Sequence, residues 1–174
     1  MKVNRWSLYQ YKLFTDELNS LVAEVKKLRE SQPDKYIEHP KTKRLARIKD
    51  LMLKEIPDDP AHERWNQGNT LGTNYRLWKR AKFGSNRFRL FFRYDGPSKI
   101  IIYAWVNNEN TLCKEGDKND PYAIFAKELK KGAPPSDLKE LLERCTEVES
   151  PGDEEAPNQD QAAFFANTNK SVDR

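Results

Sequence analysis

The chain has 174 residues and a mass of 20.4 kDa, which fits one domain of ordinary size with at most a short appended segment. Charged residues make up 33% of the chain and the mean hydropathy is -0.95, so we expect a compact core beneath a largely ionic surface. No apolar run reaches the roughly 18 residues of a membrane span, and the N-terminus lacks the pattern of a signal peptide. These features exclude a membrane protein, and we expect a cytoplasmic one with no membrane partner.

The N-terminal half predicts one strand and two helices. Residues 3–9 alternate as a strand that places Trp6 and Leu8 on one face. Apolar residues then recur at helical spacing up to a break at residues 31–33, and again from about residue 35 to 56, with an interruption at Pro40 and an end at Pro57. We expect these helices to form a hairpin that covers a sheet, followed by a long loop over residues 57–74.

The second half predicts three strands and two helices. Residues 75–83, 87–94 and 99–106 read as an antiparallel meander joined by short turns, with the third strand central because it is apolar on both faces. Asp120 caps a helix that Gly132 closes, and Ser136 opens a shorter helix. The predicted fold class is therefore α+β, with a folded domain over residues 1–145.

Residues 146–174 are too poor in apolar side chains to form a core, so we expect an acidic disordered tail. They contain seven Asp or Glu and two Lys or Arg, a net charge of -5, whereas the whole chain carries +4. Residues 1–145 therefore carry +9, and their partners should be acidic.

The cysteines and histidines offer no metal-binding pattern. Cys113, Cys145, His39 and His62 lie far apart and lack the spacing of metal ligands or of a disulfide framework. We expect the cysteines to be structural, the histidines to lie on the surface, and the protein to hold no metal or cofactor.

Residues 66–94 contain seven Lys or Arg and no carboxylate. A segment of this kind is suited to hold a polyanion such as an RNA backbone. Strand alternation divides its side chains, because Phe88, Leu90 and Phe92 alternate with arginines. If the register agrees, Arg80 and Lys82 of the preceding strand lie beside Arg87 and Arg89 on one open face, while Lys79 points elsewhere. Crowded like charges repel each other, so such a face needs a compensating use.

Five strings together carry a family resemblance: GNTLG at 68–72, RLWKRAKF at 76–83, RFRLFFRYD at 87–95, KIIIYAWVN at 99–107 and DPYAIF at 120–125. In this combination the chain resembles the YhaV toxin family, within the RelE and ParE toxin superfamily. The resemblance implies a RelE-like fold, in which a helical hairpin packs on a four-stranded, mainly antiparallel sheet followed by C-terminal helices.

The resemblance also implies an activity. Such a protein is the toxin of a type II toxin-antitoxin system, an mRNA endoribonuclease that associates with ribosomes and inhibits translation and growth. RelE-type enzymes work without a metal: the ribose 2′-hydroxyl attacks the adjacent phosphate and leaves a 2′,3′-cyclic phosphate and a 5′-hydroxyl. The implied partner is a PrlF-type antitoxin with an AbrB-like DNA-binding domain, and the toxin reaches operator DNA only through their complex.

Matching the RelE strand motifs gives the expected catalytic residues Arg80, Lys82, Arg89 and Tyr122. Arg80 and Lys82 are the paired strand cations, Arg89 clamps the phosphate, and Lys82 stabilises charge or acts as the base. Tyr122 stacks on a base or takes part in acid-base chemistry, unless it is a core residue. The general acid is unassigned, and Lys114 and Lys118 are both candidates for the loop arginine of the family. The expected RNA-binding residues are Arg76, Arg87, Arg93, Tyr103 and Trp105, although Tyr103 and Trp105 could instead plug the site.

Two other functions stay open. One is a nucleic-acid or ribosome-binding module of the same fold without chemistry, and the other is a ParE-like topoisomerase poison. The placement of the cations on strand faces favours the ribonuclease.

Overall fold

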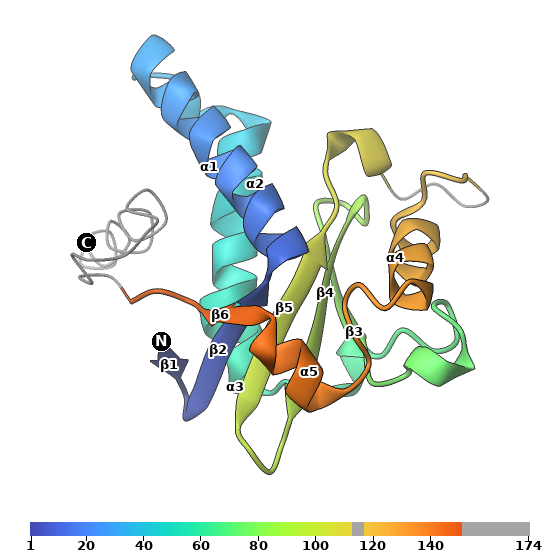
Figure 1. Cartoon of the computed structure of the whole chain (residues 1–174). Helices are drawn as coiled ribbons and strands as arrows, with labels where there is room; N and C mark the ends of the chain where they lie inside the picture. Colours follow the sequence, from blue (N-terminus) through green and yellow to red (C-terminus); the bar gives the residue numbers. More distant parts are fainter. Residues whose placement is uncertain (113–116, 151–174) are drawn as a thin grey trace.

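A computed structural model describes residues 1–112 and 117–150 of the chain. A mixed sheet divides the molecule, with helices α1 and α2 on one side and α4 on the other (Figure 1). The strands are β1 (Lys2–Val3), β2 (Trp6–Tyr11), β3 (Lys79–Phe83), β4 (Phe88–Asp95), β5 (Ile100–Val106) and β6 (Cys145–Glu147). The α-helices are α1 (Lys12–Ser31), α2 (Pro40–Asp50), α3 (Ile56–Asp58), α4 (Pro121–Lys130) and α5 (Leu138–Glu143).

The sheet follows the order β1-β2-β5-β4-β3, and β6 also pairs with β2. The strands β2 and β5 run parallel, and every other pair is antiparallel. The α+β class and the central place of β5 are therefore confirmed. Four strands were expected, and these are β2, β5, β4 and β3; the short strands β1 and β6 bring the sheet to six.

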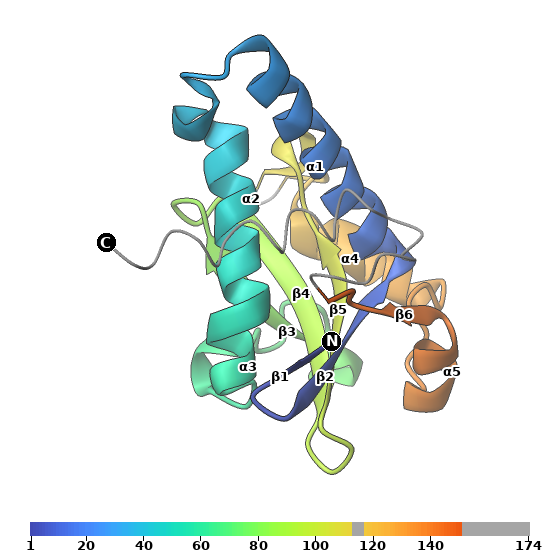
Figure 2. The same cartoon turned by 90° about the vertical axis from the view of Figure 1, so that its left-hand side faces the viewer.

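The helical hairpin forms as the apolar periodicity predicts, and it covers one face of the sheet (Figure 2). Helix α2 begins at Pro40, whose missing N–H costs nothing at a first helical position, and His39 caps it by accepting a hydrogen bond from the Lys41 backbone N–H at 3.1 Å. A π-helical segment, η2 (Leu51–Glu55), continues α2 into α3. The helical run ends at Asp58, one residue beyond the predicted end at Pro57. None of the helices in the described ranges combines the length and apolar character needed to cross a bilayer.

The long connection from α3 to β3 contains the short turns η3 (Glu63–Trp65) and η4 (Thr73–Tyr75). Strand β3 begins at Lys79, later than the expected residue 75, because residues 73–75 form the turn η4 instead. As a result Arg76 precedes the strand. A further turn, η5 (Glu109–Thr111), follows β5, and η1 (Tyr36–Glu38) joins α1 to α2.

The second face of the sheet is covered, which corrects the expectation of an open cationic face. Phe91 of β4 stacks on Phe125 of α4 with ring centroids 4.4 Å apart, and Trp78 meets Phe125 edge-on at 5.4 Å. These rings form a second apolar core, so the face is apolar over most of its area. Cations lie at its margins, where Arg80 and Arg89 reach Tyr122 at the start of α4 and Arg93 reaches Ser136 before α5.

A bulge in β5 changes which face its aromatic residues occupy. Phe91 pairs with Trp105 and Phe92 with Tyr103, so Ala104 has no partner between them. Tyr103 therefore enters the core under the hairpin, where it is 0% exposed, and Trp105 enters the core under α4 at 8% exposure. Neither residue can stack on RNA in this structure, which corrects both assignments.

The folded part of the chain extends past residue 145. Strand β6 pairs with β2, and the Val148 backbone N–H donates to the Leu8 carbonyl at 2.9 Å. The Val148 side chain is fully buried, so the expected tail begins later than residue 146. Residues 151–174 lie outside the described residues. Helix α5 is capped by Asp137, whose carboxylate accepts from the Glu140 N–H, and not by Ser136.

Candidate active site

Arg80, Arg89 and Tyr122 meet at one atom. The Nε–H groups of Arg80 and Arg89 both donate to the Tyr122 hydroxyl oxygen, each at 2.9 Å. A phenol oxygen has two lone pairs and one hydrogen. Because both donors are cations that can only donate, the oxygen accepts twice and its own hydrogen stays available to a ligand. The cluster therefore offers one O–H donor held between two positive charges.

Local structure explains how these side chains come together. In the β3–β4 hairpin Arg80 pairs with Phe91 and Lys82 with Arg89, so the cations share the sheet face that α4 covers. Asp120 accepts a hydrogen bond from the Tyr122 backbone N–H at 2.8 Å, which fixes the first turn of α4. The Tyr122 ring then stands edge-on to Phe91 at 5.6 Å.

Arg89 is the most enclosed of the three cations, at 5% exposure. Its Nη1 donates to the carbonyls of Asn86 and Phe88 at 2.8 and 2.9 Å, and its guanidinium carbon lies 5.5 Å from the centre of the Tyr122 ring. With its Nε and Nη1 engaged in this way, Arg89 is held in one orientation. Its place in the cluster agrees with the sequence prediction, whereas its burial was not foreseen.

Asn107 holds the backbone of this site, and sequence reasoning assigned it no role. Its Oδ1 accepts from the Arg89 backbone N–H at 2.6 Å, and its Nδ2 donates to the carbonyls of Arg87 and Thr111 at 3.2 and 2.7 Å. The residue is 2% exposed. Its position directly after an apolar strand could have indicated this role, because an amide buried there must form hydrogen bonds.

Arg80 and Lys82 face outward from the same margin. Arg80 is half-buried and its Nη1 donates to the Arg64 carbonyl at 2.8 Å, while Lys82 is exposed. Neither forms an ion pair with any residue in the ranges 1–112 and 117–150. Their charges are therefore available to an anionic ligand.

The three outer arginines differ in position. Arg76 is exposed and donates to the Asn69 Oδ1 from Nε at 3.1 Å, and Arg87 is exposed in the turn just before β4. Arg93 instead donates to the Ser136 carbonyl at 2.6 Å, and burial lowers its pKa although Asp95 and Asp137 oppose the shift. Arg93 thus secures the segment before α5.

Lys114 and Lys118 are the two candidates for the loop arginine of the family. Lys118 is exposed in the turn before α4, and Lys114 lies outside the described residues. In the described part of the chain, no group of three or more His, Cys, Asp or Glu side chains could hold a metal ion.

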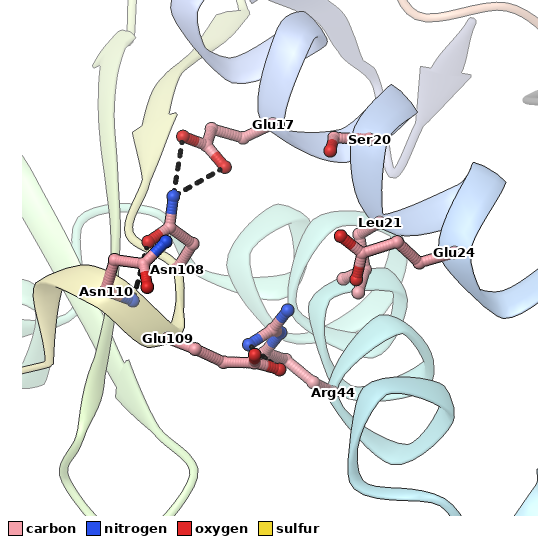
Figure 3. A pocket seen from close by; sticks show the side chains of 8 residues that line it. All are labelled: Glu17, Ser20, Leu21, Glu24, Arg44, Asn108, Glu109 and Asn110. Atoms are coloured by element: carbon pink, nitrogen blue, oxygen red, sulfur yellow. Dashed lines mark hydrogen bonds and ion pairs between the residues drawn. The ribbon is translucent and has the colours of Figure 1, made fainter.

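A cavity on the opposite side of the sheet has different chemistry. It lies between α1, α2 and the turn η5 and has a volume of about 160 Å³ (Figure 3). Its lining includes Glu17, Glu24 and Glu109, and the Asn108 amide donates to the Glu17 carboxylate at 3.2 Å. Three carboxylates repel phosphate, so this cavity is not a candidate for RNA.

Comparison with known proteins identifies the family. A family model described as a toxin with endonuclease activity, of a toxin-antitoxin system, matches residues 8–146. The chain is 42% identical over 148 residues to the Ribonuclease toxin YhaV of Escherichia coli K12, and 40% identical over 147 residues to the Toxin YhaV of Escherichia coli O6:H1. Each match covers 84% of this chain and 96% of the relative. No solved structure matched the chain. The chain therefore belongs to the YhaV family of toxins with endonuclease activity from toxin-antitoxin systems.

Proposed function

We propose that this protein is a ribonuclease toxin that cleaves mRNA at the Arg80–Arg89–Tyr122 cluster. The observation that carries the proposal is the Tyr122 hydroxyl, which accepts hydrogen bonds from two arginines and retains a hydrogen to donate. The relative from Escherichia coli K12 is named a ribonuclease toxin, which supports RNA as the substrate.

The proposed reaction uses an internal nucleophile. The ribose 2′-hydroxyl attacks the adjacent phosphorus as its proton leaves to a base, and the bond from phosphorus to the 5′-oxygen breaks. Tyr122 donates its hydroxyl proton to that leaving oxygen, and solvent later returns a proton to the phenolate. The products are a 2′,3′-cyclic phosphate and a 5′-hydroxyl. Tyr122 thereby fills the role of general acid that the sequence left unassigned.

The cations divide the remaining work. Arg80 and Lys82, which have no ion-pair partner among the described residues, stabilise the negative charge that builds up on the phosphate oxygens. Arg89 is enclosed, so we assign it to hold the Tyr122 hydroxyl in place. Lys82 is also the candidate base, because it pairs across the hairpin with a second cation, Arg89.

The wider assignment follows the family resemblance. We propose a RelE-like fold, cleavage of mRNA on the ribosome, and neutralisation by a PrlF-type antitoxin with an AbrB-like DNA-binding domain, through which the toxin would reach operator DNA. An mRNA substrate on ribosomes would place the protein in the cytoplasm. The helical hairpin on one sheet face and α4 on the other support the fold assignment.

Mapping of RNA ends tests the proposed cleavage. The wild-type protein and the Arg80→Ala variant are expressed in cells, and mRNA is examined for new 5′-hydroxyl and 2′,3′-cyclic phosphate ends. We expect such ends and growth arrest with the wild type and neither with Arg80→Ala, since the variant loses a cation at the reacting phosphate. Growth arrest by the wild type without new RNA ends would overturn the proposal. A graded, salt-dependent loss of RNA binding in a protein that never cuts would indicate a binding module instead.

Lys82→Arg and Lys82→Gln separate the two roles of Lys82. Arginine keeps the positive charge but does not accept a proton near neutral pH. If Lys82 acts only through its charge, Lys82→Arg retains most of the cleavage rate and Lys82→Gln loses it. If Lys82 is the base, both variants lose it.

A further inference from the structure

A groove of about 380 Å³ opens beside the outer edge of β3. It is lined by four residues of the loop before β3, by one residue between η4 and the strand, and by the first residue of the strand. These residues are Asn66, Gln67, Gly68, Asn69, Arg76 and Lys79. The lining contains two cations and no carboxylate, unlike the cavity between α1 and α2.

Neutral amides hold both cations. The Asn66 Oδ1 accepts from the Lys79 Nζ at 2.7 Å, and the Asn69 Oδ1 accepts from the Arg76 Nε and Nη2 at 3.1 and 2.9 Å. Amide oxygens orient the two charges without neutralising them. The Asn66 and Asn69 Nδ2 groups then remain as donors, so the polar side chains of the groove present donors and positive charge.

The third amide and the loop backbone complete the wall. Gln67 is buried, and it donates to the Tyr75 carbonyl at 3.1 Å and accepts from the Leu71 N–H at 3.0 Å, so it fixes the loop and offers nothing to a ligand. Gly68 has a φ of +63° and no atom within 4 Å of where a Cβ would stand, so a ligand can approach the backbone there. The loop is therefore built around an open, donor-rich surface.

The partial burial of Lys79 disfavours its charged form. Burial lowers its pKa, and no carboxylate offsets the shift. A partly desolvated ammonium without an anionic partner is stabilised when an anion binds. The chemistry of the groove thus calls for a ligand that carries negative charge and accepts several hydrogen bonds, and a phosphate diester satisfies both conditions.

The groove adjoins the active-site cluster along one segment of chain. Lys79 and Arg80 are neighbours in β3 and point to opposite faces of the sheet. Asn66 forms a bridge with Lys79, and the Arg64 carbonyl accepts from Arg80, so residues 64–66 touch both sites. An RNA strand bound at Arg80 would pass around this edge of the sheet to reach the groove.

We propose that the groove of Asn66, Asn69, Arg76 and Lys79 binds a phosphate of the RNA that flanks the cleaved bond, an inference that rests on the proposed function. Arg76 and Lys79 bind the phosphate oxygens, and the two asparagine amides donate to the attached nucleotide. The sequence placed Arg76 on RNA but directed Lys79 elsewhere, and the structure joins them in one site.

The test combines protein variants with altered RNA. Binding is measured on a short single-stranded RNA that carries 2′-deoxyribose at the cleavage position, with one neutral methylphosphonate linkage moved through the flanking positions. The variant is Arg76→Gln/Lys79→Gln, and the matched control is Arg29→Gln/Lys35→Gln, which removes the same charges from exposed positions on α1 and the segment that follows it. Thermal unfolding of each variant confirms that it is folded.

We expect Arg76→Gln/Lys79→Gln to bind RNA about 10-fold to 100-fold more weakly than the control, with a salt slope smaller by about 0.7 for the lost phosphate contact. At one flanking linkage the methylphosphonate should weaken the wild type and leave this variant unaffected. If every methylphosphonate weakens both proteins equally, the inference is wrong. It is also wrong if the variant binds RNA normally and loses affinity for the antitoxin, because the groove is then a protein-binding site.

Asn69→Asp provides a second test that preserves packing. Aspartate has the same shape and strengthens the hydrogen bonds to Arg76, but its charge opposes a phosphate. We expect weaker RNA binding with unchanged thermal stability, whereas a purely structural Asn69 would leave RNA binding intact. If the wild type binds RNA through the groove but cuts none, the proposed cleavage is wrong and the proposed phosphate site is supported. If the wild type cuts RNA and the groove variants bind it as well as the control does, the proposed phosphate site is wrong and the proposed cleavage is supported.

Discussion

Tyr122→Phe is the most informative single change, because it removes one oxygen and leaves the ring. The aromatic contact with Phe91 is retained, whereas the Nε–H groups of Arg80 and Arg89 lose their shared acceptor. Arg80 is half-buried and can bind water instead, but Arg89 is enclosed. We expect the free energy of unfolding to fall by about 1–3 kcal/mol, the cost of leaving one buried donor unpaired.

The expected loss of activity is larger than this loss of stability. A general acid contributes about 10²-fold to 10⁴-fold to a rate, which corresponds to roughly 3–5 kcal/mol of barrier. A domain with about 5–15 kcal/mol of stability stays folded after losing 1–3 kcal/mol. The cleavage rate of Tyr122→Phe should therefore fall by about 10²-fold to 10⁴-fold in a protein that is still folded.

Single-turnover cleavage of two substrates tests the assignment. One substrate has the ordinary 5′-oxygen, and the other has sulfur at that bridging position, which leaves without being protonated. We expect Tyr122→Phe to be impaired on the oxygen substrate and to lose less than about tenfold on the sulfur substrate. Tyr36→Phe, a tyrosine of η1 at the remote end of the helical hairpin, is the control and should behave as the wild type on both. Equal losses on both substrates would refute the role of Tyr122 as the acid and leave it a positioning residue.

Three further predictions concern buried residues elsewhere in the fold as well as one beside the site. Asn107→Ala leaves the Arg89 N–H and two carbonyls without their partner, so its free energy of unfolding should fall by about 2–4 kcal/mol in urea titration, with a parallel loss of cleavage. Burial lowers the pKa of Lys49 to about 8, so the unfolded chain binds this proton more tightly than the folded protein does. The free energy of unfolding should therefore rise as the pH increases from about 8 to 10.5. The Lys49→Met variant should lack that rise and be about 1–3 kcal/mol more stable than the wild type at pH 7. Burial raises the pKa of Cys145 to about 12, so in a Cys113→Ser background iodoacetamide at pH 8 should modify the native protein roughly a thousandfold more slowly than the urea-unfolded chain.

Local sequence patterns predicted several helices and strands that the structure contains. Apolar residues at helical spacing formed α1 and α2, and the apolar run of β5 took the centre of the sheet. Asp120 and Pro121 opened α4 because capping depends on adjacent residues only. These signals are local, so a single sequence is enough to read them.

Features that depend on distant partners were not predictable in the same way. The bulge at Ala104 moved Trp105 across the sheet, and nothing in the alternation of β5 marks it. Strand β6 formed because Val148 reaches a core built by residues far earlier in the chain. Low apolar content indicated a tail from residue 146, whereas a single buried side chain and a few backbone hydrogen bonds were enough to extend the fold.

The cationic residues of the site also combine features that local sequence patterns predict with features that depend on distant partners. Alternation placed Arg80, Lys82 and Arg89 on one face correctly, because the period of a strand is fixed. It could not show that α4 covers this face, since Tyr122 of the covering helix lies 33 residues after Arg89 and 42 residues after Arg80. Nor could it show that Asn66 and Asn69 orient Lys79 and Arg76, because amides carry no charge signal.

The absence of carboxylates from residues 66–94 has a structural reason. It involves both faces of the sheet, and a single cationic face would not explain it. Strand β3 carries cations on both faces, Arg80 and Lys82 toward α4 and Lys79 toward the groove. An acidic residue at a position that adjoins either of these two sets would pair with it in place of a phosphate. Arg80, Lys79 and Arg76 are instead held by uncharged oxygens, namely the Tyr122 hydroxyl, the Arg64 carbonyl and the two asparagine amides. Neutral acceptors fix the geometry of a cation and leave its charge for the ligand, so a carboxylate-free segment rich in such acceptors is what the two proposed phosphate sites require.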